Sequence, residues 1–212
     1  MEKLYDLFNN KASLYAANRP SYSPNVLKYL QKDLGFSSTA LGADIGCGTG
    51  QLTKILAEYF NLVYAVEPNN SMMKECQKYL YDYKNILYKC HSAENIEIDD
   101  NKLDYITAAQ AFHLFYNAET LREFKRILKP DGYLIIVYNM KNHSSDLFLK
   151  NEEVLLKYCP LYKRNFHATE FKCDSFQECF TKDSYQYRYF PNDNTEYLNY
   201  DTFIILTLSV SY

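Results

Sequence analysis

The chain has 212 residues, and its 23 Lys and Arg against 26 Asp and Glu give a formal net charge of −3. This length fits one domain around a single core, and the nearly balanced charge gives no reason to expect nucleic acid as a partner. The start of the chain carries no signal-peptide pattern, and the longest late apolar run, 203–208, is too short for a bilayer, so we expect a cytoplasmic protein without membrane contact.

The six cysteines are spread along the chain without a C-x-x-C pair or a ligand set with histidine. Thiols that stay reduced in the cytosol are enough to explain them. We therefore expect neither a disulfide framework nor a structural metal.

The first predicted elements are an aromatic lead-in over 1–22 and a helix over 23–35. In this lead-in, Arg19 directly precedes Pro20, and Tyr15 lies a few residues earlier. A residue that precedes proline is held in an extended conformation, so the Arg19 guanidinium can be aimed at a carboxylate. A surface arginine at a helix boundary explains the same spacing equally well. The helix that follows needs only a packing role.

A glycine-rich turn follows the next predicted strand, 41–45, and opens a helix over 50–59. Glycines at alternate positions let the backbone turn tightly and present main-chain N–H groups that no Cβ shields. Open α/β sheets bind nucleotides where a strand hands over to a helix in this way. The residues of the turn that could face such a ligand are Asp44, Gly46, Cys47, Gly48 and Gly50.

Two features of this turn argue against a dinucleotide. The glycines follow the spacing G-x-G-x-G, whereas dinucleotide folds use G-x-G-x-x-G. Asp44 also places a carboxylate beside the turn, which would repel a pyrophosphate but suits an ammonium group. A cationic nucleoside therefore fits the turn better, and a nicotinamide-dependent oxidoreductase is the weakest alternative.

The next predicted strand, 62–66, ends at a Glu-Pro pair that leaves Glu67 at its carboxyl end. At about this distance after the glycines, nucleotide folds place the acid that binds the ribose hydroxyls. A solvated glutamate at a strand end is the alternative. On the following helix, Met72 either touches a base or, more commonly for methionine, packs in the core.

Three more strands are predicted, over 86–90, 104–109 and 133–138, with helices between them. This alternation predicts an α/β fold with a Rossmann-like, doubly wound, mostly parallel sheet and helices on both faces. Ligands in such sheets bind beyond the carboxyl ends of the strands, where Gln110 and His113 follow the fourth strand. A lone histidine is more often structural or exposed, so spacing alone leaves the role of His113 open.

The remaining predicted elements are a proline-glycine turn over 129–132, a helix over 147–158 and an alternating strand over 185–190. The pattern loosens beyond residue 140. The sequence therefore predicts the first two thirds of the chain better than the last third.

Four segments, in order along the chain, resemble motifs of one family. Asp-Ile-Gly-Cys-Gly-Thr-Gly at 44–50 resembles the first motif of class I S-adenosylmethionine-dependent methyltransferases. Three further segments are similar to segments of the trans-aconitate methyltransferase-like group, which has a methyltransferase type 11 domain. They are Tyr-x-x-x-Arg-Pro-x-Tyr at 15–22, Glu-Pro-x-x-x-Met at 67–72 and Ala-Gln-Ala-Phe-His at 109–113. The resemblance covers roughly residues 5–140.

The resemblance implies S-adenosyl-L-methionine as the cofactor and one domain over 1–212. Its parts would be an N-terminal lid and helix (1–35), a cofactor-binding core (36–140) and an acceptor-side part (141–212). It also implies that Arg19 and Tyr15 lid the cofactor pocket and that His113 faces the methyl acceptor. The implied cofactor-binding residues are Tyr15, Arg19, Asp44, Gly46, Cys47, Gly48, Gly50, Glu67, Pro68, Met72, Ser92, Ala93, Glu94, Gln110 and Ala111. Ser92, Ala93 and Glu94 would lie on the adenine side, where Ser92 departs from the family's common acid.

We therefore expect methyl transfer to a small-molecule acceptor, on a carboxylate or hydroxyl oxygen. A carboxylate acceptor would need no base, whereas an amine or phenol would need one, for which His113 is the candidate. Family members finish with a hairpin of two strands, of which only the strand over 185–190 is evident here. We therefore expect the C-terminal hairpin to be incomplete. The alternative function is a protein that binds the cofactor without transferring its methyl group. We expect a monomer or weak homodimer.

Overall fold

The structure is a computed structural model and describes residues 21–140, 142 and 144–159. The expected lid residues Tyr15 and Arg19 lie outside the described residues. The expected strand over 185–190, and with it the C-terminal hairpin, also lies outside them.

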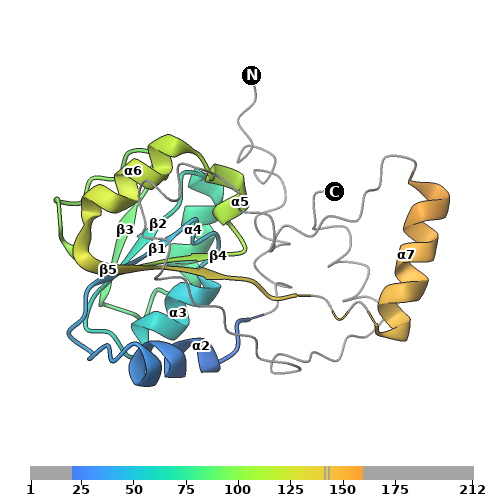
Figure 1. The fold of residues 1–212 in the computed structure, drawn as a ribbon, viewed down its shortest axis with the longest axis horizontal. Helices are drawn as coiled ribbons and strands as arrows, with labels where there is room; N and C mark the ends of the chain where they lie inside the picture. The colour runs from blue at the N-terminus through green and yellow to red at the C-terminus, as the bar shows by residue number, and fades with distance from the viewer. Residues whose placement is uncertain (1–20, 141, 143, 160–212) are drawn as a thin grey trace.

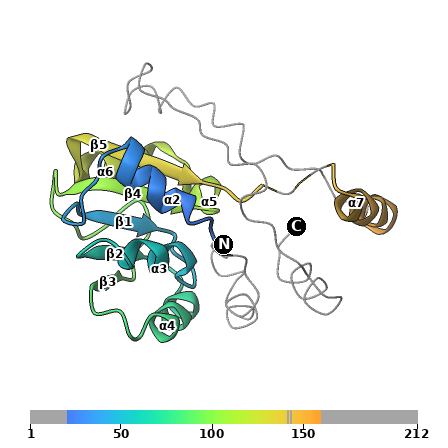
Figure 2. The ribbon, with the colours of Figure 1, turned by 90° about the horizontal axis from the view of Figure 1, so that it is seen from below.

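Five parallel strands form one sheet in the order β3-β2-β1-β4-β5 (Figure 1). The strands are β1 (Gly42–Ile45), β2 (Val63–Val66), β3 (Ile86–Lys89), β4 (Leu103–Ala109) and β5 (Leu128–Val137). Figure 2 shows them in this order, from β5 at the top to β3 below. The central strands are almost fully buried, as parallel strands covered on both faces must be. The predicted Rossmann-like fold is confirmed.

Helices cover both faces of the sheet. They are α2 (Asn25–Lys28), continued by the π-helical turn η2 (Tyr29–Asp33), then α3 (Gln51–Ala57), α4 (Asn70–Tyr79), α5 (Phe112–Phe115) and α6 (Ala118–Ile127). Tyr105 packs with the apolar residues of η2 and α3, whereas its neighbour Ile106 packs with those of α5 and α6. Because successive side chains of a strand point to opposite faces, α3 and α6 lie on opposite sides of the sheet.

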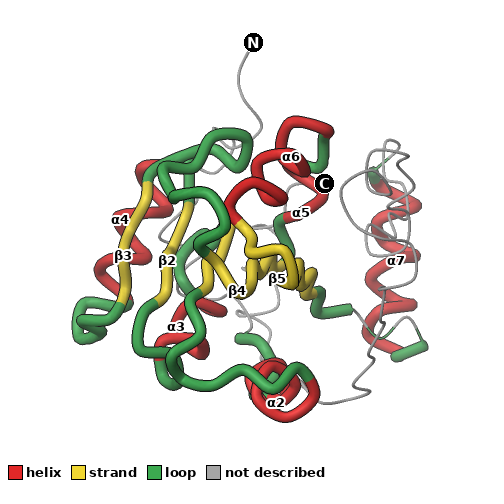
Figure 3. Tube along the Cα trace, turned by 60° about the vertical axis from the view of Figure 1, so that its left-hand side comes forward, coloured by secondary structure: helices red, strands yellow, loops and turns green. Residues whose placement is uncertain are grey.

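The helix α7 lies apart from the helices that cover the sheet, beyond the end of β5 (Figure 3). Its bounds, Asp146–Tyr158, agree with the helix predicted over 147–158. Ser145 starts it by accepting the Phe148 N–H on its side-chain oxygen at 3.3 Å. None of the helices in the described part of the chain is long and apolar enough to cross a membrane.

The turn predicted over 129–132 differs from the structure. The strand β5 begins earlier, at Leu128, which pairs with Leu103 of β4, and the next pair in the register joins Tyr133 to Tyr105. Four residues of β5 therefore stand against one residue of β4, and they form an exposed irregularity inside the strand. The proline and glycine still break the pairing, but the chain resumes the same strand after them.

Candidate functional site

The glycine-rich turn lies at the carboxyl end of β1, between β2 and β4. The chain moves outward from β1 in both directions, first to β2 and β3 and then to β4 and β5. Open α/β sheets bind their ligands at the carboxyl edge where the strand order reverses in this way. The N–H groups of Gly46 and Cys47 donate to the Val66 carbonyl at 2.8 and 3.1 Å, so the turn is fixed to the end of β2.

The three glycines of the turn have positive φ angles of 68°, 56° and 89°, which L side chains rarely adopt. A Cβ on Gly46 would lie 2.7 Å from the Ala111 Cβ, and one on Gly50 would lie 2.8 Å from the Cys76 Sγ. A Cβ on Gly48 would meet no atom within 4 Å. Gly46 and Gly50 are therefore required by packing as well, and Gly48 is where a ligand can approach the backbone.

Asp44 lies beneath the turn with its carboxylate buried and only 1% of the residue exposed. Thr53 donates its hydroxyl to one carboxylate oxygen at 2.6 Å, and Thr107 donates to the other at 3.0 Å. Burial raises the pKa of Asp44 from 3.8 to about 6, although the two hydroxyl bonds act in the other direction. At neutral pH Asp44 is thus a buried negative charge held in place below the turn.

Glu67 follows β2 and is 7% exposed. Its Oε2 accepts the Gly48 N–H at 3.0 Å, and its Oε1 accepts the Asn69 N–H at 2.9 Å. Burial raises the pKa of Glu67, and these two backbone bonds oppose that rise. A carboxylate can accept about four hydrogen bonds, so each oxygen keeps one acceptor position beside the open side of Gly48.

Thr49 is a site residue that the sequence analysis missed. It is 2% exposed, and its side-chain oxygen is buried without a hydrogen-bond partner among the described residues. An unpaired buried hydroxyl is costly, and this one directly follows Gly48, the glycine with open space beside it. Its presence inside the glycine motif was the only signal available from the sequence.

Cys47 and the start of α4 complete this side of the site. The Cys47 thiol is buried, and its hydrogen bond with the Cys76 thiol, with burial, raises its pKa well above the ordinary value. Asn69 starts α4 by accepting the N–H groups of Ser71 and Met72 on its side chain. Asn69 was also missed, although an Asn before a helix is a recognisable capping signal. Pro68 is half-buried beside it.

Met72 lies in the first turn of α4 and is 3% exposed, so its side chain is in the protein interior. The structure thus places it in the core environment that methionine more commonly occupies, next to the site.

The predicted adenine-side residues follow β3. Ser92 is half-buried and Ala93 is buried in the core cluster that also contains residues of α6. Glu94 accepts a hydrogen bond from the side-chain amide of Asn117, the residue that starts α6, at 3.1 Å. Glu94 also lines a surface hollow over α6 with Arg122. The structure therefore pairs Glu94 with α6, whereas Glu67 bonds the glycine turn through the Gly48 N–H.

Gln110 ends β4 on the other side of the turn, with a positive φ of 52°. Its main-chain N–H donates to the Val137 carbonyl at 2.9 Å, and its side-chain amide donates to the Asn139 carbonyl at 2.7 Å. Asn139 in turn donates its side-chain amide to the Ser21 carbonyl at 3.0 Å. The chain entering from the expected lid is thus tied to the carboxyl ends of β4 and β5.

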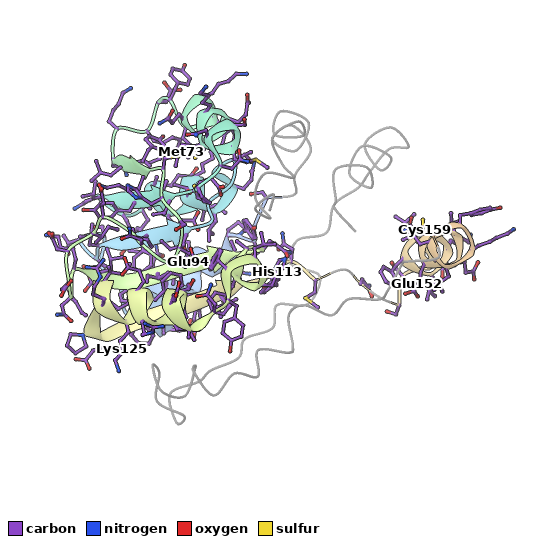
Figure 4. All side chains as sticks on the ribbon, turned by 90° about the horizontal axis from the view of Figure 1, so that it is seen from above. Met73, Glu94, His113, Lys125, Glu152 and Cys159 are labelled. Carbon is purple, nitrogen blue, oxygen red and sulfur yellow. The ribbon has the colours of Figure 1, made fainter. Side chains whose placement is uncertain are left out.

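His113 lies in α5, on the flank of the domain where the chain leaves β5 toward α7 (Figure 4). Its ring Nδ1 is 3.0 Å from the hydroxyl oxygen of Tyr138, which follows β5. Ala111, two residues earlier, lies close to the glycine turn, where a Cβ on Gly46 would meet it. The short segment 111–113 therefore joins the glycine turn to the histidine. Tyr138 was missed, because no sequence pattern pairs it with a residue 25 positions earlier.

Comparison with known proteins identifies this arrangement. Residues 43–136 match the family model described as a methyltransferase domain. In this region the chain is similar to the class I S-adenosylmethionine-dependent methyltransferases. The match is to the methyltransferase domain in general, so the closer resemblance to the trans-aconitate group stays a prediction.

Two methyltransferases illustrate the range of relatives. An uncharacterized methyltransferase of Schizosaccharomyces pombe is 29% identical over 151 residues, which are 71% of this chain and 59% of that protein. The ubiquinone/menaquinone biosynthesis C-methyltransferase of Campylobacter jejuni is 25% identical over 230 residues, covering 95% of this chain and 93% of its own. The chain thus spans less than two thirds of the first of these relatives.

Solved structures share the fold of this methyltransferase domain. A methyltransferase from Aquifex aeolicus superposes with a TM-score of 0.54 at 22% identity, over 68% of this chain and 84% of its own. The [4+2]-cyclase SpnF superposes with a TM-score of 0.55 at 16% identity, over 63% and 58% of the two chains. At these identities the comparison establishes the fold and leaves the reaction to the site residues.

Proposed function

We propose that this methyltransferase transfers a methyl group from S-adenosylmethionine to an oxygen atom of a small-molecule acceptor, with a carboxylate as the first candidate and a hydroxyl as the second. The observation that carries the proposal is the group formed by Gly48, Thr49 and Glu67 at the carboxyl edge of the sheet. It combines an open backbone, an unpaired buried hydroxyl and unused carboxylate lone pairs.

These residues fit the chemistry of the cofactor. Glu67 would accept the two ribose hydroxyls with the lone pairs that the Gly48 and Asn69 amides leave unused. The Thr49 hydroxyl would gain the partner that it lacks. The buried charge of Asp44 favours the amino group and the sulfonium of the cofactor over an anionic pyrophosphate. When bound, S-adenosylmethionine supplies a methyl group on a positively charged sulfur.

The transfer itself asks little acid–base chemistry of the protein. A lone pair of the acceptor oxygen forms the bond to the methyl carbon, the carbon–sulfur bond breaks, and its electron pair stays on the sulfur. The enzyme has to align the acceptor and keep water away. A carboxylate already carries the attacking lone pair at neutral pH, so its methylation releases no proton. Because no proton has to be removed, a carboxylate is the first candidate for the acceptor.

The fold and family alone do not fix the acceptor. The Campylobacter relative is named a C-methyltransferase, and the cyclase SpnF has the same fold. The second candidate function is therefore a protein that binds S-adenosylmethionine without transferring its methyl group. It would need the same Glu67 and Gly48 contacts but no acceptor site.

Two measurements on the full chain test the proposal. Calorimetry with S-adenosylmethionine and with NAD should show binding of the first only, and binding of NAD alone would refute the cofactor assignment. Release of S-adenosylhomocysteine should then be measured over matched panels of small carboxylates, alcohols, phenols and amines. Turnover with carboxylates or alcohols is the expected result. Cofactor binding without turnover on any panel would favour the second candidate function, and turnover confined to amines would refute oxygen transfer.

A further inference from the structure

One tyrosine makes two contacts with His113, the histidine expected to face the methyl acceptor. Tyr138 follows the last residue of β5 and its side chain is half-buried. The main-chain N–H of His113 points at the Tyr138 hydroxyl oxygen at 3.4 Å, and the ring Nδ1 of His113 lies 3.0 Å from the same oxygen. A single hydroxyl group therefore fixes both the backbone and the side chain of His113.

The main-chain contact follows from the position of His113 in its helix. His113 is the second residue of α5, and the first N–H groups of a helix have no partner within the helix. The Tyr138 oxygen accepts this N–H from outside, which ties the start of α5 to the end of β5. This contact uses the hydroxyl as an acceptor.

The side-chain contact needs one donor. A tyrosine hydroxyl has one proton, and burial raises the pKa of Tyr138 to about 12, so the proton stays on the oxygen at neutral pH. The oxygen accepts the His113 N–H, and the hydroxyl proton can be donated to Nδ1 at 3.0 Å. An imidazole that accepts at Nδ1 carries its own proton on Nε2.

We propose that Tyr138 is a positioning residue that holds His113 as the Nε2–H tautomer, so that His113 donates a hydrogen bond to the methyl acceptor and does not remove a proton from it. This inference rests on the proposed function, and it extends that function by giving His113 a definite chemical role. A donor at this position suits an acceptor that already carries a nucleophilic lone pair. One carboxylate oxygen would accept a hydrogen bond from the Nε2–H group and the other would attack the methyl carbon, so no proton would be transferred.

The opposite polarity makes a different enzyme. If Nδ1 carried the proton and donated it to Tyr138, Nε2 would present a lone pair. His113 would then be a base suited to a phenol or an amine. The two arrangements share every heavy-atom position given above, so the tautomer of His113 decides between them.

The tautomer is measured directly by NMR of protein labelled with ¹⁵N-histidine, with the His113 signals assigned from their loss in His113→Gln. The expected result is a neutral His113 ring protonated on Nε2 alone. Tyr138→Phe keeps the ring and removes the hydroxyl, so it should let His113 sample both tautomers. Tyr133→Phe, at a residue within β5 that is 45% exposed, is the matched control and should change nothing. A proton on Nδ1 in the unmodified protein, or the same tautomer in Tyr138→Phe, would overturn the proposal.

Kinetics test the donor role separately. His113→Gln can place an amide N–H near the position of Nε2, whereas the shorter His113→Asn cannot reach it. The first variant should keep kcat/KM for the acceptor within about tenfold, the effect of one hydrogen bond, and the second should lose more. Equal and nearly complete loss in both variants would point to a base and contradict the proposal.

Tyr138→Phe should lower kcat/KM for the acceptor by about tenfold while the Kd for S-adenosylhomocysteine stays within twofold. The unchanged Kd also verifies that the variant is folded. A loss of cofactor affinity equal to the loss of activity would show that Tyr138 only supports the fold. Absence of methyl transfer in the unmodified protein would count against the proposed function, whereas the NMR experiment would still decide the tautomer.

Discussion

Replacing Glu67 with glutamine should weaken cofactor binding about 10- to 150-fold. The two oxygens of Glu67 accept the Gly48 and Asn69 amides at 3.0 and 2.9 Å. Glutamine has one oxygen and one NH₂ group, so one of these backbone donors would face another donor. One ribose hydroxyl would lose a charged acceptor at the same time. A hydrogen bond to a charged group contributes about 1.5–3 kcal/mol, which corresponds to the stated change in Kd.

Calorimetric titration with S-adenosylhomocysteine measures this change without turnover. Glu58→Gln is the matched control, because Glu58 is exposed and follows the last residue of α3, at the opposite edge of the parallel sheet. Its Kd should equal that of the unmodified protein. An unchanged Kd in Glu67→Gln, with the control also unchanged, would refute the ribose-binding role of Glu67 and with it the main support for the proposed function.

Three further changes test the physical account of the domain. Asp44→Asn should stabilise the ligand-free protein at pH 7 by about 3 kcal/mol. The pKa of Asp44 is raised from 3.8 to about 6, so its ionisation lowers the free energy of unfolding as pH rises from about 4 to 6, and this free energy stays lower above pH 6. Urea unfolding should show the gain at pH 7 and not at pH 4, and the same gain at both pH values would contradict this account. Tyr105→Phe should leave the free energy of unfolding unchanged or raise it by about 1 kcal/mol, because the Tyr105 hydroxyl is buried without a hydrogen-bond partner among the described residues. A clear loss of stability in thermal unfolding would argue against this explanation. Arg126→Met should lower the free energy of unfolding by about 2 kcal/mol in chemical unfolding, because the buried carboxylate of Glu123 loses its ion-pair partner. Arg122→Met, on the exposed side of α6, should have no measurable effect. Similar losses in both variants would show that the ion pair is not the cause.

The sequence predicted the scaffold because its signals are local. The strand predicted over 62–66 is β2, Val63–Val66, and the helix predicted over 147–158 is α7, Asp146–Tyr158. Apolar residues within each element and a proline shortly after its last residue are local signals that suffice for such elements. The position of Glu67 at a strand end also follows from its own neighbours, Val66 and Pro68.

The contacts within the site could not be predicted in the same way, because they depend on strand register. Asp44 meets Thr107 because these two residues are paired between β1 and β4, 63 positions apart in the sequence. His113 meets Tyr138 because β5 ends beside the start of α5. A shift of one residue in either pairing would turn the partner to the other face of the sheet. Local pattern and spacing selected the glycine turn and Glu67, and the resemblance to a family supported both, but neither gave a reason to select Thr49 or Tyr138.

Charge explains why this edge of the sheet suits S-adenosylmethionine in particular. Burial raises the pKa of both Asp44 and Glu67, and the charge of Asp44 raises that of Glu67 further. Their hydrogen-bond donors are hydroxyl and backbone N–H groups, and in the described residues no Lys or Arg forms an ion pair with either carboxylate. Two buried anions without a cationic partner favour a cationic ligand over an anionic one. Under the proposed function, methyl transfer would remove the sulfonium charge, so the same two carboxylates that favour the cofactor would hold the product less strongly.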